Sequence, residues 1–520
     1  MKAKALMIQG TGSHAGKSAI TAALCRIFSD MKIKVAPFKA QNMALNSGVT
    51  KDGLEMGRAQ IAQAEAAFLE PHVDMNPVLL KPTGESRSQL IIQGRVKGQV
   101  SSAEFQTFKK EAFAYVKESY ERLASKYELI IIEGAGSPAE INLRENDIAN
   151  MGTAHMADAK VLLVGDIDRG GVFASLIGTL ELLDQKDKDR ICAFIINKFR
   201  GDIELLKPAL KTLEERSKLP VAGVVPFIQN LRLEEEDGVS LERVSERTSG
   251  QSLESLRENK NTIKAGVIHL PRISNHTDFS PLMIEDDLLV KYIREPHEIS
   301  DLDLLIIPGS KNVIGDMIYL REAGFDKAIF EHKKAGKFIF GVCGGYQILG
   351  EKISDPHHVE AGSEIQGLGL LKMNTVLMPE KETRQVRFQF HDASNILNIN
   401  GHTMRGYEIH AGKSGFEEDS DGGRLFQVES LTENGAVYYD GVVTAEGRLW
   451  GTYIHGIFDN DSFREAFLRF IRERKTPAKS ASHIKKSVSY AEMKEAEFER
   501  LAKVVKENMN IDWLCEKLKL

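Results

Sequence analysis

The stretch ALMIQGTGSHAGKSAITAAL (residues 5–24) joins an apolar run, a glycine-rich turn and a segment of helical periodicity. It predicts a buried strand, a loop and a helix that places Leu24 and Ile27 on one face. In such a loop the backbone N–H groups and the helix N-terminus face phosphates. Lys17 can neutralise phosphate oxygens, and the Ser18 hydroxyl can reach Mg²⁺. The stretch therefore predicts a nucleotide-binding domain built on a parallel sheet.

The loop departs from the strict P-loop pattern. Five residues stand between Gly10 and Gly16, one more than the strict pattern has. A chance glycine loop is the alternative, but the strand, the Gly-Lys-Ser run and the amphipathic helix all agree with a phosphate site. The longer loop is similar to that of dethiobiotin synthetase and its relatives, which use ATP to activate a carboxylate. The predicted nucleotide-binding residues of the loop are Gly10, Thr11, Gly12, Gly16, Lys17 and Ser18.

Acidic residues follow two further apolar strands. LIIIEGAGSP supplies Glu133, and LLVGDIDRGG supplies Asp166 and Asp168. We expect Ser18, Glu133 and Asp166 to face Mg²⁺, although an acid after a strand often caps the following helix instead. IINKFRGD resembles the base-reading segment of the dethiobiotin synthetase family, which implies that Asn197 lies near the adenine.

Changes in pattern along the chain predict two α/β domains. Over residues 1–230, short apolar runs alternate with helical patterns, which is typical of a parallel sheet covered on both sides by helices. Residues 231–261 are polar and charged, which predicts a linker. The β-rich pattern resumes over 262–460, and 461–520 has the pattern of a helical tail.

The composition narrows the class of protein. The chain is 42% hydrophobic and 27% charged with a net charge of −6, so we expect a globular protein without a nucleic-acid or anionic-membrane partner. No apolar stretch approaches the roughly 20 residues that cross a bilayer, and the N-terminal run leads into glycines instead of a signal-peptide cleavage site. The four cysteines are far apart without a CxxC pair, which favours a reducing, cytoplasmic location over disulfides or zinc.

FIFGVCGGYQILG (residues 338–350) carries a second kind of chemistry. It places Cys343 in the G-x-C-x-G form of a nucleophile elbow between a strand and a helix. The helix N-terminus would lower the pKa of the thiol, and the N–H of Gly344 could stabilise an oxyanion. A free cysteine is more often buried and inert. GTYIHG, however, supplies His455 as a possible base.

PGSKN (residues 308–312), GVCGGYQILG and GTYIHG resemble the class I glutamine amidotransferases in their order and spacing. The resemblance implies that Cys343 attacks the amide of glutamine and releases ammonia. It also implies that the turn at Gly309 and Ser310 completes an oxyanion hole with Gly344.

The sequence departs from that family after His455. The family has a glutamate two residues after the histidine, whereas this chain has Ile457. Either Cys343 and His455 work as a dyad, or another group orients the imidazole. GYEIHAG offers Glu408 and His410 as candidates for that group.

A carboxylate-activating half joined to a glutaminase half is typical of an ATP-dependent amidoligase. A glutaminase half without its glutamate, joined behind a dethiobiotin-synthetase-like half, resembles the group of cobyric acid synthases and cobyrinic acid diamide synthases. Four stretches resemble signatures of the cobyric acid synthases, namely PFKAQNMALNS (37–47), MNPVLLKP (75–82), GDIDRGGVFASL (165–176) and LPRISNHTDF (270–279). The resemblance implies ATP- and glutamine-dependent amidation of several peripheral carboxylates of adenosylcobyrinic acid a,c-diamide. It further implies possible substrate-lining residues, which are Lys39, Gln41, Asn42 and Asn46.

Alternatives stay open for the substrate-lining loop and for the function. The asparagines of the loop could instead cap the loop itself. The chain could be a cobyrinic acid diamide synthase or a CTP-synthase-like amidotransferase. It could also be a P-loop switch ATPase of the partitioning type with a degenerate amidotransferase-like binding domain. KAQNMALNS argues against the diamide synthase, the missing glutamate against the CTP-synthase type, and the intact Cys343 and His455 against the switch ATPase.

Overall fold

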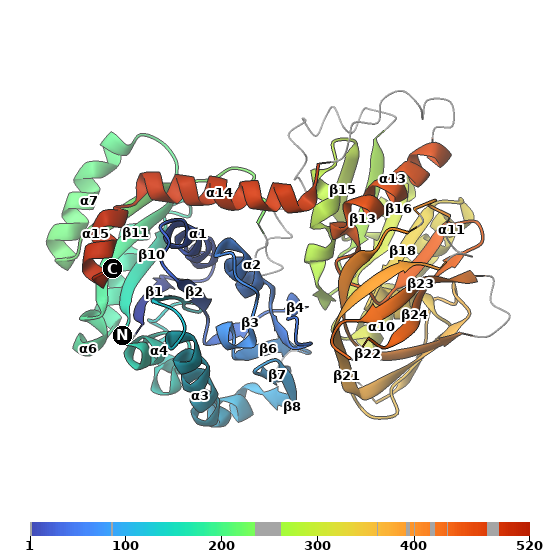
Figure 1. Cartoon of the computed structure of the whole chain (residues 1–520), viewed down its shortest axis with the longest axis horizontal. Coiled ribbons are helices and arrows are strands. Elements are labelled where there is room, and N and C mark those ends of the chain that lie inside the picture. Colours follow the sequence, from blue (N-terminus) through green and yellow to red (C-terminus); the bar gives the residue numbers. More distant parts are fainter. Residues whose placement is uncertain are drawn as a thin grey trace. The chain divides into compact units, whose positions relative to one another are not determined.

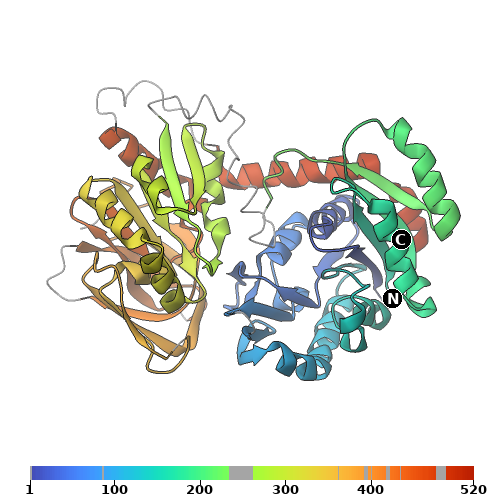
Figure 2. The same cartoon turned by 180° about the vertical axis from the view of Figure 1, so that it is seen from behind.

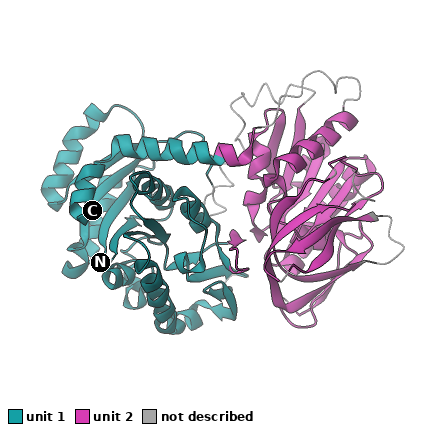
Figure 3. Cartoon of the chain, viewed as in Figure 1, with its two compact units in different colours: residues 1–44, 55–236, 494–520 teal, residues 45–54, 237–493 magenta. Residues whose placement is uncertain are grey.

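The computed structural model describes residues 3–84, 87–233, 262–360, 362–391, 396–399, 401–416, 422–433, 435–475 and 488–520. The chain forms two compact units, coloured separately in Figure 3. The first unit consists of Met1–Ala44, Glu55–Glu236 and Lys494–Leu520, and the second of Leu45–Leu54 and Asp237–Met493. The predicted linker, 231–261, lies outside the described residues from 234 onward.

A parallel sheet of six strands forms the centre of the first unit (Figure 1). Its strands, in spatial order, are β12 (Val221–Pro226), β11 (Ile191–Phe199), β10 (Lys160–Asp166), β1 (Lys4–Gly10), β9 (Leu129–Glu133) and β2 (Val35–Phe38). Alternate residues of β1 enter two different apolar cores, with Met7 in one and Leu6 and Ile8 in the other. Both faces of the sheet are therefore covered, which explains the continuous apolar runs and confirms the predicted fold class.

Helices from distant parts of the sequence cover this sheet. They are α1 (Lys17–Asp30), α2 (Arg58–Ala66), α3 (Ser102–Ala124), α4 (Met151–Ala157), α5 (Val172–Leu182), α6 (Gln185–Lys188), α7 (Ile203–Ser217), α14 (Tyr490–Asn508) and α15 (Ile511–Leu518). Phe498, Leu501 and Val505 of α14 are buried in the same apolar core as the buried face of α1. The helical tail thus completes the first unit from residue 494 onward.

The first unit also contains a small sheet that the sequence did not predict. Its strands, in spatial order, are β3 (Gln41–Met43), β6 (Val78–Pro82), β7 (Arg87–Ile92) and β8 (Arg95–Ser101). A further strand of this unit is β5 (Glu55–Gly57). These strands are short and partly polar, which weakens the apolar pattern by which strands are predicted.

The second unit has a mixed sheet of eleven strands (Figures 1 and 2). Its parallel part consists of β15 (Leu288–Ile293), β13 (Ile263–Ile268), β16 (Leu304–Ile307), β18 (Phe338–Val342) and β25 (Leu449–Thr452). The sheet continues with β24 (Val437–Thr444), β23 (Gly422–Ser430), β21 (Met373–Phe390), β22 (Met404–Phe416), β19 (Lys352–Ser354) and β20 (Glu364–Gln366). The predicted strands are β13, β16, β18 and β25 of the parallel part. The antiparallel strands were not predicted; in β21, buried and exposed residues alternate at both ends and the middle is half-buried or exposed.

The remaining elements of the second unit are helices and very short strands. In the part of the chain that the structure describes, the helices are α10 (Val313–Glu322), α11 (Phe325–Lys334), α12 (Gly344–Leu349) and α13 (Asp461–Lys475), with the 3₁₀ segments η4 (His276–Ile284), η5 (Pro296–Asp301) and η7 (Ile457–Asp459). The short strands are β4 (Ser47–Val49), β14 (Ile273–Ser274) and β17 (Gly309–Ser310). Among the described residues, no helix is both long and apolar enough to cross a membrane.

Candidate functional site

The glycine-rich loop of the first unit lies at the carboxyl edge of its parallel sheet. Gly10, Glu133 and Asp166 each end a strand of that sheet, and Asn197 is near the end of β11. Because the carboxyl ends of parallel strands meet at one edge, these residues share the edge at which open α/β sheets bind ligands. The structure therefore brings the predicted nucleotide-binding residues to one side of the first unit.

The loop is held by contacts that restrict its backbone. Gly16 has φ 95°, and a Cβ at this position would lie 2.1 Å from Nδ2 of Asn197, so only glycine fits. Asn197 Nδ2 donates a hydrogen bond of 2.9 Å to the carbonyl of Ala15. Lys17 Nζ donates to the carbonyls of Gly12 and Gly136 at 2.9 and 3.1 Å. The ammonium group is thus held directly over the loop, where a phosphate would sit.

Glu133 is the centre of a buried polar cluster beside the loop. Its Oε1 accepts hydrogen bonds from Ser18 Oγ at 2.7 Å and from Lys39 Nζ at 3.0 Å. Its Oε2 accepts from Gln63 Nε2 at 2.5 Å. Burial would raise the pKa of Glu133, but the charge of Lys39 and these donors hold it below its usual value. An ionised carboxylate next to a serine hydroxyl is a donor set that suits Mg²⁺.

Asp166 and Asp168 have basic partners in the structure. Asp166 Oδ2 lies 2.7 Å from Lys198 Nζ, and Lys198 also donates to the carbonyl of His14 in the loop at 2.6 Å. Asp168 accepts from Arg200 Nε at 2.9 Å. No group of three potential metal-binding carboxylates, histidines or cysteines occurs within the described ranges. The Mg²⁺-facing role of Asp166 stays a prediction, with Ser18 and Glu133 the better-placed pair.

The predicted substrate-lining residues fall into two places. Lys39 contacts Glu133, and Asn42 Nδ2 donates to Gln60 Oε1 at 2.7 Å, so both belong to the polar cluster of the first unit. Gln41 opens β3. Asn46, in contrast, belongs to the second unit, where its side chain contacts His276. The alternative of a self-capped loop is not supported, because both asparagines bind residues outside the loop.

Cys343 occupies a strained turn between β18 and α12. Its φ of 51° and ψ of −108° lie outside the usual regions for a residue with a side chain. Its backbone N–H donates to the carbonyl of Thr452 at 2.8 Å. A Cβ at Gly345 would lie 1.9 Å from the carbonyl oxygen of Ile307, so the elbow requires glycine there. This is the geometry that the sequence predicted for a nucleophile elbow.

The predicted oxyanion residues surround the elbow. β17, which consists of Gly309 and Ser310, pairs with β14. A Cβ at Gly344 would lie 2.7 Å from the backbone nitrogen of Ser310, and a Cβ at Gly309 would lie 3.5 Å from Cε1 of His455. The turn at 309–310, the elbow and the histidine are therefore neighbours.

Asp278 is the acidic partner of His455. Its Oδ2 lies 2.6 Å from His455 Nδ1, and its Oδ1 accepts a hydrogen bond of 3.1 Å from the backbone of Gly456. The imidazole also stacks on Tyr407, with ring centroids 5.3 Å apart. Asp278 was missed as a site residue, although it stands in the LPRISNHTDF signature. That signature was the available signal, but nothing in it points to His455.

Asp278 and Cys343 set the protonation of His455. Burial would lower the pKa of the imidazole, but the charges of Asp278 and the thiolate raise it to about 10. Burial would raise the pKa of the Cys343 thiol, but His455 and, more weakly, His410 bring it below its usual value. These shifts both favour a thiolate paired with an imidazolium, which is the reactive form of a cysteine nucleophile.

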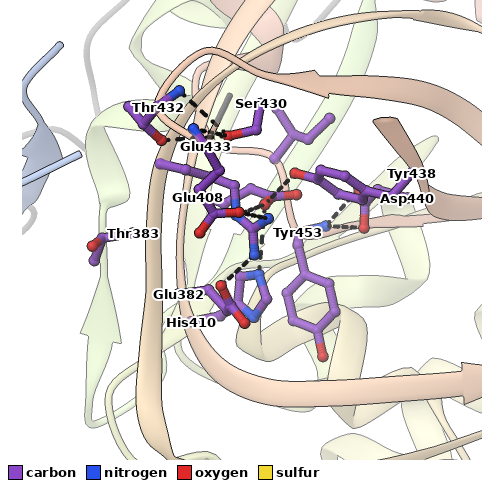
Figure 4. Close-up of polar contacts among 12 residues, drawn as sticks. Glu382, Thr383, Glu408, His410, Ser430, Thr432, Glu433, Tyr438, Asp440 and Tyr453 are labelled. Carbon is purple, nitrogen blue, oxygen red and sulfur yellow. Dashed lines mark hydrogen bonds and ion pairs between the residues drawn. The ribbon is translucent and has the colours of Figure 1, made fainter. Parts of the chain in front are cut away.

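Glu408 and His410 are not the group that orients His455, so that expectation is wrong. Glu408 Oε2 accepts from Tyr438 OH at 2.6 Å and lies 3.2 Å from Arg384 Nε (Figure 4). His410 Nδ1 donates to the carbonyl of Gly412 in its own strand at 2.8 Å, and its ring stacks on Tyr453. The site is not a simple dyad either, because Asp278 supplies the third group.

The side chain at 457 explains why the acid comes from elsewhere. Ile457 is fully buried in the apolar core of the second unit, which also contains Phe458. A carboxylate at this position would lose its hydration on burial. The fold replaces the expected neighbour in sequence by a residue 177 positions away.

Comparisons with known proteins agree with the two sites. Residues 6–241 match the model of the CobQ/CobB/MinD/ParA nucleotide binding domain, and residues 264–463 match that of the CobB/CobQ-like glutamine amidotransferase domain. The cobyric acid synthase of Caldanaerobacter subterraneus subsp. tengcongensis is 44% identical over 98% of this chain and 97% of its own length. The cobyric acid synthase of Syntrophobacter fumaroxidans is 45% identical over 98% of this chain and 98% of its own length. That of Clostridium acetobutylicum is 47% identical over 98% of this chain and 97% of its own length. The chain belongs to the cobyric acid synthase family.

Proposed function

We propose that this chain amidates carboxylates of adenosylcobyrinic acid a,c-diamide to give cobyric acid, with glutamine as nitrogen donor and ATP as energy source. The observation that carries the proposal is the pairing of two complete sites in one chain of this family. One is a strained Cys343 with His455 and Asp278, and the other is a phosphate loop with Lys17 beside a buried carboxylate.

The glutaminase site can release ammonia with its own residues. The Cys343 thiolate attacks the side-chain carbonyl carbon of glutamine, and the negative oxygen is stabilised by N–H groups of Ser310 and Gly344. His455 gives its proton to the amide nitrogen, the carbon–nitrogen bond breaks, and ammonia leaves a γ-glutamyl thioester. Neutral His455 then takes a proton from water, the hydroxide attacks the thioester, and glutamate leaves as the thiolate returns.

Asp278 has the role of a positioning residue in this cycle. It accepts a hydrogen bond from His455 Nδ1, which fixes the ring so that Nε2 faces the thiol and the leaving nitrogen. Its charge stabilises the imidazolium that forms at the start and end of each turnover. Its second oxygen is tied to the Gly456 N–H, so the carboxylate cannot rotate away from the ring without losing that bond.

The first unit would make the acceptor carboxylate reactive. A carboxylate oxygen attacks the γ-phosphorus of ATP, ADP leaves, and the product is an acyl phosphate. Ammonia attacks the acyl carbon, phosphate leaves, and a proton is lost to give the amide. Lys17 and Lys39 neutralise phosphate charge at the carboxyl edge of the sheet.

Ser18 and Glu133 would hold Mg²⁺ next to these groups. When bound, the ion neutralises part of the phosphate charge and aligns the phosphates for transfer. The 2.7 Å hydrogen bond between the Ser18 hydroxyl and the Glu133 carboxylate supports this proposal, because it holds the two oxygens next to each other. Asn197, which contacts the loop through Ala15, is proposed to lie near the adenine.

The experiment that tests the proposal compares acceptors. The purified full chain is incubated with Mg-ATP and either glutamine or ammonium, with adenosylcobyrinic acid a,c-diamide or cobyrinic acid as acceptor, and products are followed by mass spectrometry. We expect successive mass changes of one amidation each on the diamide with either nitrogen source. Amidation of cobyrinic acid alone would identify the chain as a diamide synthase. ATP hydrolysis without amidation of either acceptor would favour the switch ATPase.

A further inference from the structure

A ten-residue segment from the N-terminal half of the sequence belongs to the glutaminase unit. Residues 45–54 cluster with the second unit, whereas the residues on both sides of them, 1–44 and 55–236, belong to the first. The segment includes β4 and is mostly buried, with Asn46 and Ser47 almost inaccessible to solvent. The segment contacts residues that neighbour each member of the glutaminase site, which are Asp278, His455 and Cys343.

The first set of contacts fixes the turn that carries Asp278. His276 donates its backbone N–H to Asn46 Oδ1 at 3.1 Å, and Asn46 Nδ2 lies 2.5 Å from His276 Nε2. Ser47 N donates to Asn275 Oδ1 at 3.3 Å, and Asn275 Nδ2 donates back to the Ser47 carbonyl at 3.1 Å. All four residues are buried.

Asn275 has a positive φ of 51°, a conformation that costs free energy unless its surroundings hold it. Its carbonyl accepts the backbone N–H of Asp278 at 3.0 Å, so the turn leads directly into the residue that contacts His455. The two reciprocal hydrogen bonds with Ser47 hold this side chain together with a 3.3 Å hydrogen bond from Asn275 Nδ2 to Tyr407 OH. They therefore help to set where the Asp278 carboxylate points.

The second set of contacts reaches His455 and Cys343 through β22. Tyr407 OH lies 3.4 Å from the Ser47 carbonyl, and the Tyr407 ring stacks on His455. Val49 packs in a small buried cluster with Tyr407 and Ile409. The Ile409 carbonyl lies 3.5 Å from Cys343 Sγ.

Two carbonyl groups of the segment accept hydrogen bonds from side chains of β21. Thr383 Oγ1 donates to the carbonyl of Gly53 at 2.8 Å, and Gln385 Nε2 donates to the carbonyl of Val49. These side-chain donors come from a strand of the glutaminase sheet. The segment is therefore held along its length by the second unit, and is not a loop that touches it at one point.

We propose that residues 45–54 are a positioning element of the glutaminase site, with Asn46 and Ser47 as its principal positioning residues. The glutaminase site is incomplete without a segment whose two ends continue into the nucleotide-binding unit. At one end, Lys39, which contacts Glu133, stands seven residues before Asn46. At the other, Glu55 is buried and paired with Lys81 at 2.9 Å. The inference rests on the proposed glutaminase chemistry.

This inference and the family resemblance make opposite predictions for Asn46. If Asn46 lines the acceptor site, its loss impairs amidation equally with glutamine and with ammonium. If it positions the glutaminase site, its loss impairs only reactions that need glutamine. Glutamine hydrolysis can also be measured without any corrinoid. The test of Asn46 therefore gives a result even if adenosylcobyrinic acid a,c-diamide is not the acceptor.

The test uses the full chain with Asn46→Ala. We expect kcat/KM for glutamine hydrolysis to fall by roughly 10- to 100-fold, the effect of a catalytic group displaced by up to about 1 Å. Ammonium-dependent amidation should stay within about twofold, which also shows that the variant is folded. The acid limb of the glutaminase pH profile should move to higher pH, because a displaced His455 stabilises the thiolate less. A merely structural role would leave that limb in place.

Two further variants sharpen the result. Asn46→Asp keeps an oxygen that can accept the His276 N–H, so it should recover part of the lost activity. Asn374→Ala, at an exposed position of β21, is the matched control and should behave as the unchanged protein. Glutamine hydrolysis by Asn46→Ala within twofold of the unchanged protein would overturn the proposal. Equal loss of glutamine- and ammonium-dependent amidation would also overturn it, in favour of an acceptor-lining role.

Discussion

Replacing Asp278 by asparagine removes one negative charge from the glutaminase site and keeps the size of the side chain. Asp278 Oδ2 lies 2.6 Å from His455 Nδ1 in a buried setting, and the pKa of His455 is raised to about 10. Against an ordinary histidine this pKa represents about 5 kcal/mol of preference for the imidazolium. Of the two negative charges that raise the pKa of His455, Asp278 has the larger effect. Removing the charge of Asp278 should therefore destabilise the imidazolium by about 2 to 3 kcal/mol.

That cost should appear as a fall of about 100-fold in kcat/KM for glutamine. The pH range over which Asp278→Asn hydrolyses glutamine should become narrower at both its acid and its alkaline limit. In the unchanged protein the reactive ion pair exists between the lowered pKa of Cys343 and the raised pKa of His455. Without Asp278 the pKa of His455 falls, so the alkaline limb moves to lower pH. The thiolate then has a weaker partner at a given pH, so the acid limb moves to higher pH.

The assay is steady-state glutamine hydrolysis across the pH range, with ammonium-dependent amidation as the measure of an intact first unit. Asp301→Asn is the matched control, because Asp301 is an exposed carboxylate of the same unit whose ion pair with Lys264 has little influence on stability. A profile of Asp278→Asn that superimposes on that of the unchanged protein would refute the reasoning, because His455 would then be oriented without Asp278.

Two other predictions concern buried positions. Glu133→Gln leaves Lys39 buried without its carboxylate and removes a proposed Mg²⁺ oxygen, so ADP formation should fall at least about 100-fold with either nitrogen source. Glutamine hydrolysis by this variant should remain within about threefold, and a selective loss of hydrolysis would contradict the assignment. Ile457→Glu introduces the glutamate of the related amidotransferases, but into an apolar core, so it should not raise glutaminase activity. It should lower the midpoint of thermal unfolding by several degrees, because a buried unpaired carboxylate costs at least about 2 kcal/mol; an unchanged midpoint would show that position 457 can reach solvent.

The parts of the site that local sequence encodes were predictable. The phosphate loop and the elbow at Cys343 each occupy one short stretch, and the positions that leave no room for a Cβ are glycines within that stretch. Gly16 and Gly345 are examples, since any Cβ there would collide with Asn197 or Ile307. The buried parallel strands were predictable for a similar reason, because both of their faces are apolar.

The remaining parts depend on contacts between distant residues. Asp278 contacts His455 across 177 positions, and the signature in which it stands has no feature that points to His455. Asn46 stands in a run that reads as one loop of the nucleotide-binding half, yet the chain divides between the two units just before it. The long antiparallel strands were missed because β21 has half-buried and exposed side chains through its middle.

Cys343→Ala provides the most direct test of the central claim, that one chain makes ammonia at one site and consumes it at another. The variant and the unchanged protein are given adenosylcobyrinic acid a,c-diamide, Mg-ATP and either glutamine or ammonium at alkaline pH, and the amidated products are quantified by mass spectrometry. The account predicts that the variant forms no product with glutamine and keeps at least about half of the ammonium-dependent rate. Product formation from glutamine by the variant would contradict the account. So would loss of both activities in a variant whose midpoint of thermal unfolding equals that of the unchanged protein.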